Sequence, residues 1–204
     1  MSGQKARSRL GRWGTVLGLY LLAVAMGLAS AWWVLTRAPW SGAVVRVGPW
    51  SGSTLAGSPD ADLYTRARVA LQGLLALGRE ETIYYVAQQD DQGRPLRTRC
   101  RYTVSGTPPG ARWWSITAYA DDFFLLNVAP GHFSVNSSNL KLDGGGRFLL
   151  HTGPQAPDGG LAWLPTPGDR GLVLTLRLYN PGPDLQAAPG GLNAPSIQRT
   201  GDCS

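Results

Sequence analysis

Charged and chemically reactive side chains are scarce in this sequence. Of its 204 residues, 16% are charged, two are cysteine and two are histidine. No spacing typical of zinc ligands occurs, so we expect neither a metal nor another cofactor. The Gly-x-Ser-x-Gly elbow of serine hydrolases is also missing. The 27 glycines and 15 prolines make up about a fifth of the chain and argue against a helical bundle.

The excess of positive charge is concentrated near the N-terminus. Of the net charge of +6, four charges come from Lys5, Arg7, Arg9 and Arg12, which precede every acidic residue. The rest of the chain carries 15 basic and 13 acidic residues. A nearly neutral domain lacks the basic surface that binds nucleic acid by counter-ion release. We therefore expect no nucleic-acid partner.

One uncharged stretch is long enough to cross a membrane. It comprises the 24 residues from Trp13 to Thr36, which as a helix span about 36 Å, more than the ~30 Å hydrocarbon core. The basic residues before it and the flanking tryptophans predict a single-pass anchor over 13–36, with 1–12 in the cytoplasm and the remainder exported. Two alternatives stay open. The segment is a signal peptide cleaved near Ala29-Ser30-Ala31, or it is a buried core helix.

The two cysteines agree with export. Cys100 and Cys203 are far apart in the sequence, and one intramolecular disulfide is the simplest interpretation. It would close a loop of about a hundred residues and tie down the C-terminus. The alternative is a pair of unrelated thiols.

The exported part begins with irregular sequence and then a helix. Residues 37–57 mix proline, glycine, serine and tryptophan without periodicity, which predicts a linker before a domain at 58–204. Ser58 and Pro59 predict the start of a helix that ends near Gly78. Apolar residues recur there at helical spacing, so we expect this stripe to face the domain. Its members are Leu63, Ala67, Ala70, Leu71, Leu74 and Leu75.

The remaining sequence consists of short β-type runs separated by turns. This pattern predicts seven to nine strands in a mainly β fold, an antiparallel, jelly-roll-like β-sandwich with one packed helix, preceded by a single transmembrane helix. In Gly171–Tyr179, leucines occupy one face and Val173, Thr175, Arg177 and Tyr179 the other. Alternation over 97–105 directs Cys100 toward the core. Other strands are expected over 82–89, which forms a hairpin with 97–105, and over 112–119, 123–128, 133–137, 140–142 and 147–152.

Four phrases of the sequence occur together in one known family. They are SPDADLYTRARVALQGLLALGREETIYYVAQQDDQGRPLRTRCRY, RWWSITAYADDFFLLNV, LYNPGPDL and the ending IQRTGDC. Through them the chain resembles the bacterial envelope family called domain of unknown function 1214 over about residues 57–203. The resemblance implies a β-sandwich in the periplasm, here held at the inner membrane by 13–36. Family members often carry a second domain, and in this sequence an N-terminal anchor stands in its place. The resemblance implies no catalytic residues.

A candidate binding site lies on the face of the strand over 171–179 that carries both polar and apolar residues, opposite the leucines. It comprises Tyr119, Arg177 and Tyr179, together with Asp121 in a turn and His132 in a loop. The aromatic rings provide stacking surface, and a guanidinium is a planar donor for a carboxylate, a phosphate or a sugar hydroxyl. Core packing with an interstrand ion pair is the alternative explanation of the same residues.

These observations favour a non-catalytic envelope module that binds a lipid, a glycan or a protein partner. An envelope enzyme that acts on a small apolar or carbohydrate substrate is the first alternative, because turns bring tyrosine, arginine, aspartate and histidine toward one end of the sheet. A structural subunit of an envelope complex is the second, suggested by the anchor and linker.

Overall fold

The structure is a computed structural model that describes residues 3–36, 44–71, 75, 77–201 and 203. It divides into two units, Met1–Trp40 and Ser41–Ser204. The first contains helix α1 (Gly3–Thr36), of which Arg12–Leu35 is long and apolar enough to cross a membrane. No part of the most apolar window of α1 is buried.

The described part of the second unit contains ten strands in two sheets. The larger sheet has the order β1 (Val44–Val47), β2 (Trp50–Ser53), β3 (Thr82–Ala87), β9 (Leu172–Pro181), β5 (Ala111–Ala120) and β6 (Ser134–Asn136). The smaller has the order β10 (Ser196–Arg199), β4 (Tyr102–Gly106), β7 (Phe148–Gly153) and β8 (Trp163–Pro165). Neighbouring strands are antiparallel except for the pair β7 and β8. The predicted mainly β, sandwich-like fold is confirmed.

The hydrophobic core is built by the inner faces of both sheets. Strand β9 is central in the larger sheet, and its alternating leucines at 172, 174, 176 and 178 are at most 1% exposed, as the sequence pattern predicts. Trp114 of β5 and Phe148 of β7 place their ring centroids 5.0 Å apart. This aromatic pair therefore joins the two sheets across the core.

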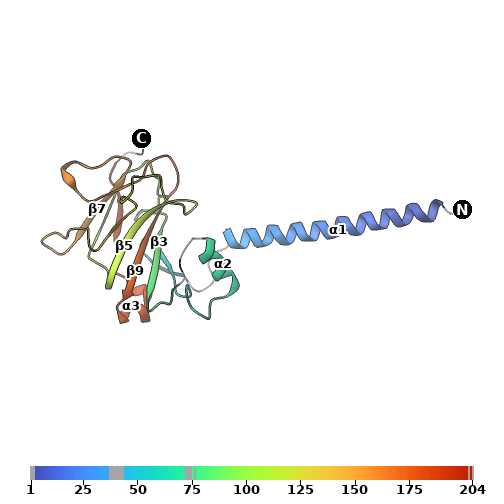
Figure 1. Cartoon of the computed structure of the whole chain (residues 1–204), viewed down its shortest axis with the longest axis horizontal. Helices are drawn as coiled ribbons and strands as arrows, with labels where there is room; N and C mark the ends of the chain where they lie inside the picture. The colour runs from blue at the N-terminus through green and yellow to red at the C-terminus, as the bar shows by residue number, and fades with distance from the viewer. Residues whose placement is uncertain (1–2, 37–43, 72–74, 76, 202, 204) are drawn as a thin grey trace. The chain divides into compact units, whose positions relative to one another are not determined.

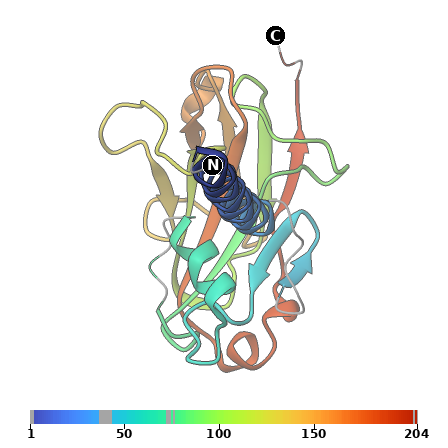
Figure 2. The ribbon, with the colours of Figure 1, turned by 90° about the vertical axis from the view of Figure 1, so that its right-hand side faces the viewer.

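Helix α2 (Leu63–Leu71) forms a third layer. Figure 1 shows β7 of the smaller sheet, then β5, β9 and β3 of the larger, then α2, and in Figure 2 α2 lies in front of the larger sheet.

Helix α2 starts at Leu63 because Asp62 Oδ1 accepts a hydrogen bond from the Thr65 amide at 2.7 Å. Asp62 is thus the capping residue where the sequence suggested Ser58. The short helices η1 (Asp158–Gly160), α3 (Pro183–Ala187) and η2 (Pro189–Gly191) lie in loops.

The prediction that the leucine stripe of α2 faces the domain is wrong. The buried residues of the helix are Thr65, Arg68 and Val69, whereas Leu63 is 82% exposed and Leu71 is 56% exposed. Helical spacing defines an apolar face but does not determine which layer that face meets.

Two strands lie within the segment 37–57 that the sequence predicts as a linker. β1 and β2 extend the larger sheet from β3. Trp50 of β2 is 0% exposed, and its indole Nε1 donates to the carbonyl oxygen of Pro195 at 2.7 Å. The four-residue strands are too short to show a period, so the sequence pattern missed them. Residues 37–43 lie outside the described residues.

Other strand predictions also need correction. The expected hairpin of 82–89 with 97–105 does not form, because β3 pairs with β2 and β9 while β4 pairs with β10 and β7 in the other sheet. The run 123–128 begins in a turn, since Phe123 has φ of 63° and its amide donates to the Ala120 carbonyl, and it then contributes only a bridge between Leu125 and Tyr119. The run 140–142 contributes only a bridge between Leu142 and Phe148. The pairing partners of a strand depend on contacts distant in sequence, which a local pattern does not show.

The predicted disulfide is present. Cys100 and Cys203 are bonded across 103 positions of sequence, and Cys100 is 0% exposed. Burial alternates from Arg97 to Tyr102 as predicted, although β4 begins only at Tyr102. The disulfide attaches the chain end after β10 to the core of the sandwich.

Asp90 is a buried carboxylate in the turn after β3. Its Oδ1 accepts hydrogen bonds from the amides of Gln92 at 3.0 Å and Arg94 at 2.9 Å, and its Oδ2 accepts one from Arg94 Nε at 2.8 Å. Burial opposes ionisation, but the hydrogen bonds from the backbone and side chain of Arg94 outweigh it. The pKa of Asp90 therefore lies below its ordinary value of 3.8.

We expect Asp90→Asn to destabilise the domain at pH 7 and to matter progressively less in acid. A lowered pKa in the folded state stabilises the fold above the unfolded pKa of ~3.9, and this contribution disappears as the pH falls through the folded value. Thermal unfolding of both proteins at pH 7 and at about pH 3 measures the difference. The exposed Asp158→Asn serves as control, and a gap in melting temperature that stays constant with pH would contradict the expectation.

Candidate functional site

The outer face of the larger sheet carries polar and aromatic side chains at its centre. Arg177 of β9 lies opposite Tyr84 on β3 and Ser115 on β5. Because side chains alternate between the faces of a strand, Arg177 points away from the leucine core. It is half-buried, and Tyr84 and Ser115 are buried.

The guanidinium of Arg177 is held by neutral groups. Its Nη1 donates to Thr117 Oγ1 at 3.0 Å and its Nη2 to the Tyr119 hydroxyl at 2.6 Å. The guanidinium carbon lies 5.4 Å from the centroid of the Tyr119 ring. Within the described part of the chain, no ion pair includes Arg177. These two hydrogen bonds engage two of the five N–H groups of the guanidinium, and no carboxylate among the described residues neutralises its charge.

Aromatic side chains flank this arginine. The Tyr84 hydroxyl donates to the Leu75 carbonyl oxygen at 2.6 Å. The pKa of Tyr84 is raised, chiefly by burial and then by the neighbouring Tyr179, while the charge of Arg177 opposes the rise. Tyr179 and Trp113 stack edge to face with centroids 5.1 Å apart. We call the set Tyr84, Trp113, Thr117, Tyr119, Arg177 and Tyr179 the arginine–tyrosine face.

The predicted site is only partly assembled in the structure. Tyr119 contacts Arg177, and Tyr179 lies two positions further along β9 on the same face. Asp121 instead lies beyond the end of β5 and pairs with Arg170 at 3.2 Å. His132 is exposed in a turn in which its amide donates to the Ala129 carbonyl.

Arg170 organises the turn that carries Asp121. Its Nη2 also contacts Asp122 Oδ2 at 2.5 Å, and this hydrogen bond lowers the pKa of Asp122. A side chain at Gly171 would place its Cβ 2.7 Å from Asp121 Cβ, so the close approach of the two loops requires glycine there. The acidic pair is thus accounted for by an exposed ion-pair network.

A family model described as a protein of unknown function, DUF1214, matches residues 81–183. The chain belongs to this family. The match covers a shorter range than the 57–203 expected from the sequence phrases. It contains every residue of the arginine–tyrosine face, whereas α1, β1, β2 and α2 lie outside it.

Two solved structures are similar to this DUF1214 protein. The crystal structure of the VPA0106 protein from Vibrio parahaemolyticus has 18% identity and a TM-score of 0.59, and the similarity covers 91% of this chain and 45% of that one. An uncharacterised protein from Burkholderia cenocepacia has 16% identity and a TM-score of 0.43 over 58% and 30% of the two chains. The first similarity shows the fold alone, and this chain spans less than half of that protein's length. No curated protein matches the sequence.

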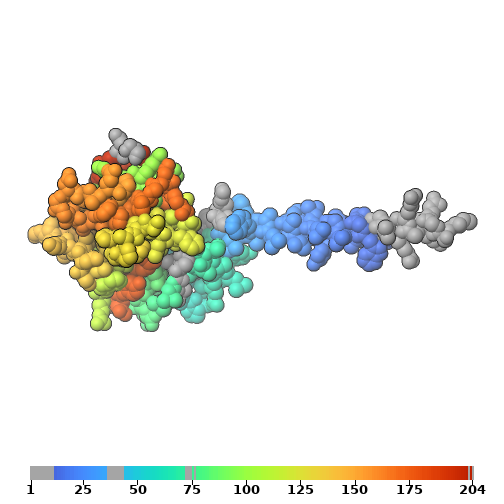
Figure 3. Space-filling view, turned by 45° about the horizontal axis from the view of Figure 1, so that its top comes forward, coloured from blue at the N-terminus to red at the C-terminus, as the bar shows by residue number. Residues whose placement is uncertain are grey.

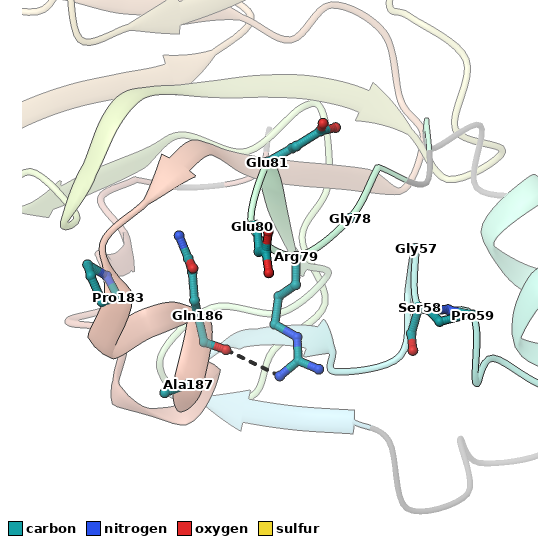
Figure 4. A pocket seen from close by; sticks show the side chains of 10 residues that line it. All are labelled: Gly57, Ser58, Pro59, Gly78, Arg79, Glu80, Glu81, Pro183, Gln186 and Ala187. Atoms are coloured by element: carbon teal, nitrogen blue, oxygen red, sulfur yellow. Dashed lines mark hydrogen bonds between the residues drawn. The ribbon is translucent and has the colours of Figure 1, made fainter.

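A separate cleft lies beside α3. It has a volume of about 590 Å³ and is lined by 57–59, 78–81, Pro183, Gln186 and Ala187. Figure 4 shows Arg79 pointing toward α3, where its Nη1 donates to the Gln186 carbonyl oxygen at 3.2 Å, while Glu81 points away. This contact fastens α3 to the segment before β3. We assign it a structural role.

The sequence missed Tyr84, Trp113 and Thr117 as members of the face. Alternation along 82–87 shows that Tyr84 and Tyr85 point to opposite faces, but only the pairing of β3 with β9 shows which one meets Arg177. His132 and His151 lie on different parts of the fold, and His151 is on β7 of the smaller sheet. No group of three or more histidine, cysteine or acidic residues suited to a metal occurs in the ranges that the structure describes.

Proposed function

We propose that this DUF1214 protein is a single-pass inner-membrane protein whose periplasmic β-sandwich binds an anionic ligand at the arginine–tyrosine face. The length and apolar composition of α1 support the anchor. The Cys100–Cys203 disulfide supports an oxidising compartment. The family is consistent with both and assigns no reaction.

The charge of Arg177, which no carboxylate of the described residues neutralises, carries the proposal. The buried Asp90 is paired with Arg94 at 2.8 Å. The guanidinium of Arg177, by contrast, donates to the neutral hydroxyls of Thr117 and Tyr119. A half-buried cation without an anion is unfavourable in a medium of low polarity. A ligand carboxylate or phosphate supplies the missing charge, and the adjacent rings pack against an apolar or aromatic group.

Small aromatic anions test this proposal. We expect benzoate or phenyl phosphate to raise the melting temperature of the full chain in a non-ionic detergent, and the uncharged benzyl alcohol to have a much smaller effect. Arg177→Gln should weaken binding of the anions by roughly 10- to 100-fold, because a hydrogen bond to a charged group contributes about 1.5–3 kcal/mol. Thermal-shift titration measures both effects.

The exposed Arg147→Gln is the matched control and should bind the anions like the wild type. Equal binding by Arg177→Gln would contradict the proposal, as would equal stabilisation by the neutral alcohol. Release of phosphate from phenyl phosphate would instead favour an envelope enzyme.

A further inference from the structure

Helix α2 presents its apolar side chains to the outside of the domain. Leu63 is 82% exposed, Tyr64 54% and Leu71 56%, and Leu75 beyond the helix is 71% exposed. In Figure 3 the teal segment that contains α2 lies at the surface of the domain. Clustered exposure of large apolar residues marks an interaction surface.

Helical geometry places these residues on one side. At about 100° per residue, Leu63, Tyr64 and Leu71 fall within an arc of roughly 100°. The buried residues Thr65 and Val69 point to the opposite half of the helix, toward the domain. We call Leu63, Tyr64, Ala70 and Leu71 the α2 apolar face.

The length of chain between α1 and the sandwich determines what lies near this face. Helix α1 ends at Thr36 and β1 begins at Val44, so seven residues, 37–43, connect them. A segment of that length spans at most about 25–30 Å. The sandwich therefore stays close to any membrane that α1 crosses. Strand β1 and α2 both belong to the larger-sheet side of the sandwich.

We propose that the α2 apolar face lies in the interfacial layer of the membrane that α1 spans. This rests on the membrane anchoring in the proposed function. Leucine and tyrosine on one side of a short helix are suited to the boundary between headgroups and acyl chains. Four side chains on nine residues are too few to form the ~800 Å² per partner of a stable protein interface. A bilayer is therefore the better occupant than a second copy of the chain.

Membrane contact also positions the candidate site. The carbonyl oxygen of Leu75, just beyond α2, accepts the hydrogen bond of the Tyr84 hydroxyl. Tyr84 is the cross-strand neighbour of Arg177. With α2 at the lipid surface, the arginine–tyrosine face lies near the headgroups.

Lipid quenching of single fluorescent labels tests the contact. Both native cysteines are in the disulfide, so Leu63→Cys or Leu71→Cys provides one reactive thiol for a polarity-sensitive dye. The full chain is reconstituted in phosphatidylcholine vesicles with a minor share of phosphatidylglycerol, with or without lipids that carry a nitroxide on an upper acyl carbon. We expect the α2 labels to be quenched at least about twofold more than a label at Leu149→Cys, since interfacial helices insert to that depth.

Leu149 is a matched control because it is also an exposed leucine, 46% accessible, but on β7 of the smaller sheet. A label at Leu21→Cys in α1 reports the anchor separately. Quenching at Leu21 without quenching at 63 or 71 overturns this inference and leaves the anchor intact. No quenching at Leu21 overturns the anchor itself. A blue-shifted α2 label that depends on protein density and not on nitroxide lipid identifies a second copy as the occupant, which also overturns the inference.

Discussion

Replacing Cys100 and Cys203 together with alanine should lower the free energy of unfolding of the sandwich by about 4–5 kcal/mol. The crosslink joins residues 103 positions apart, and a closed loop of this size removes much conformational entropy from the unfolded chain. Alanine is preferable to serine at position 100 because the side chain is fully buried and a hydroxyl there would lack water. Urea unfolding followed by tryptophan fluorescence measures the loss.

Two controls separate the crosslink from packing effects. Reduction of the wild-type protein should reproduce most of the loss, and Cys203→Ala alone should approach the double variant. A loss below about 1 kcal/mol, well short of the loop-entropy value, would mean that the C-terminal attachment contributes little to the fold. Equal mobility of membrane-extracted protein on gels with and without reductant would show that the disulfide does not form in the cell.

Trp50→Ala should destabilise the domain by about 3–5 kcal/mol, because it removes a large side chain from a fully packed site. Trp50 is 0% exposed and opposes Ala87 of β3 and Val47 of β1. Its indole also satisfies the carbonyl of Pro195, 145 positions away in sequence. Denaturant unfolding of the variant measures the loss and tests whether β1 and β2 belong to the cooperative fold.

Trp50→Phe keeps most of the apolar volume and should lose less stability than alanine. The exposed Leu149→Ala should change stability by no more than ~0.5 kcal/mol, as is usual for surface positions. If Trp50→Ala behaved like Leu149→Ala, the interpretation of 37–57 as a linker would be restored.

The elements predicted correctly are those whose signal is local. Alternation over 171–179 predicted the central strand β9 and its buried leucines, because period two determines both faces of a strand. Alternation around Cys100 predicted its burial. A charge-free stretch of 24 residues needs no tertiary information to be recognised as able to span a bilayer.

The elements predicted wrongly depend on partners far along the chain. Strands β3 and β4 follow each other in sequence but join different sheets, where β3 pairs with β2 and β9 and β4 pairs with β10 and β7. The run 123–128 has β-type composition, yet Phe123 adopts a positive φ in a tight turn. Composition alone cannot distinguish these outcomes, because the β-propensity of a residue contributes less to its conformation than its tertiary packing does.

The candidate site shows the same division. Arg177, Tyr119 and Tyr179 could be named from the sequence, because alternation places an arginine and two rings on outward faces of strands. Only the strand register shows that Tyr119 and Thr117 accept hydrogen bonds from the guanidinium and that Tyr84 lies beside it. Only the close approach of two loops shows that Asp121 pairs with Arg170.

By itself, the sequence determined that the chain carries one membrane-length apolar helix, a β-rich domain and a single pair of cysteines, since periodicity, length and composition are read along the chain. The tertiary structure alone decided that residues 44–53 complete the larger sheet and that Arg177 is surrounded by neutral hydroxyls and rings. It also decided that the leucines of α2 face outward. These features depend on which surfaces meet in space. The core of the sandwich is filled by the larger apolar faces of the two sheets, so the small apolar face of α2 is not buried there.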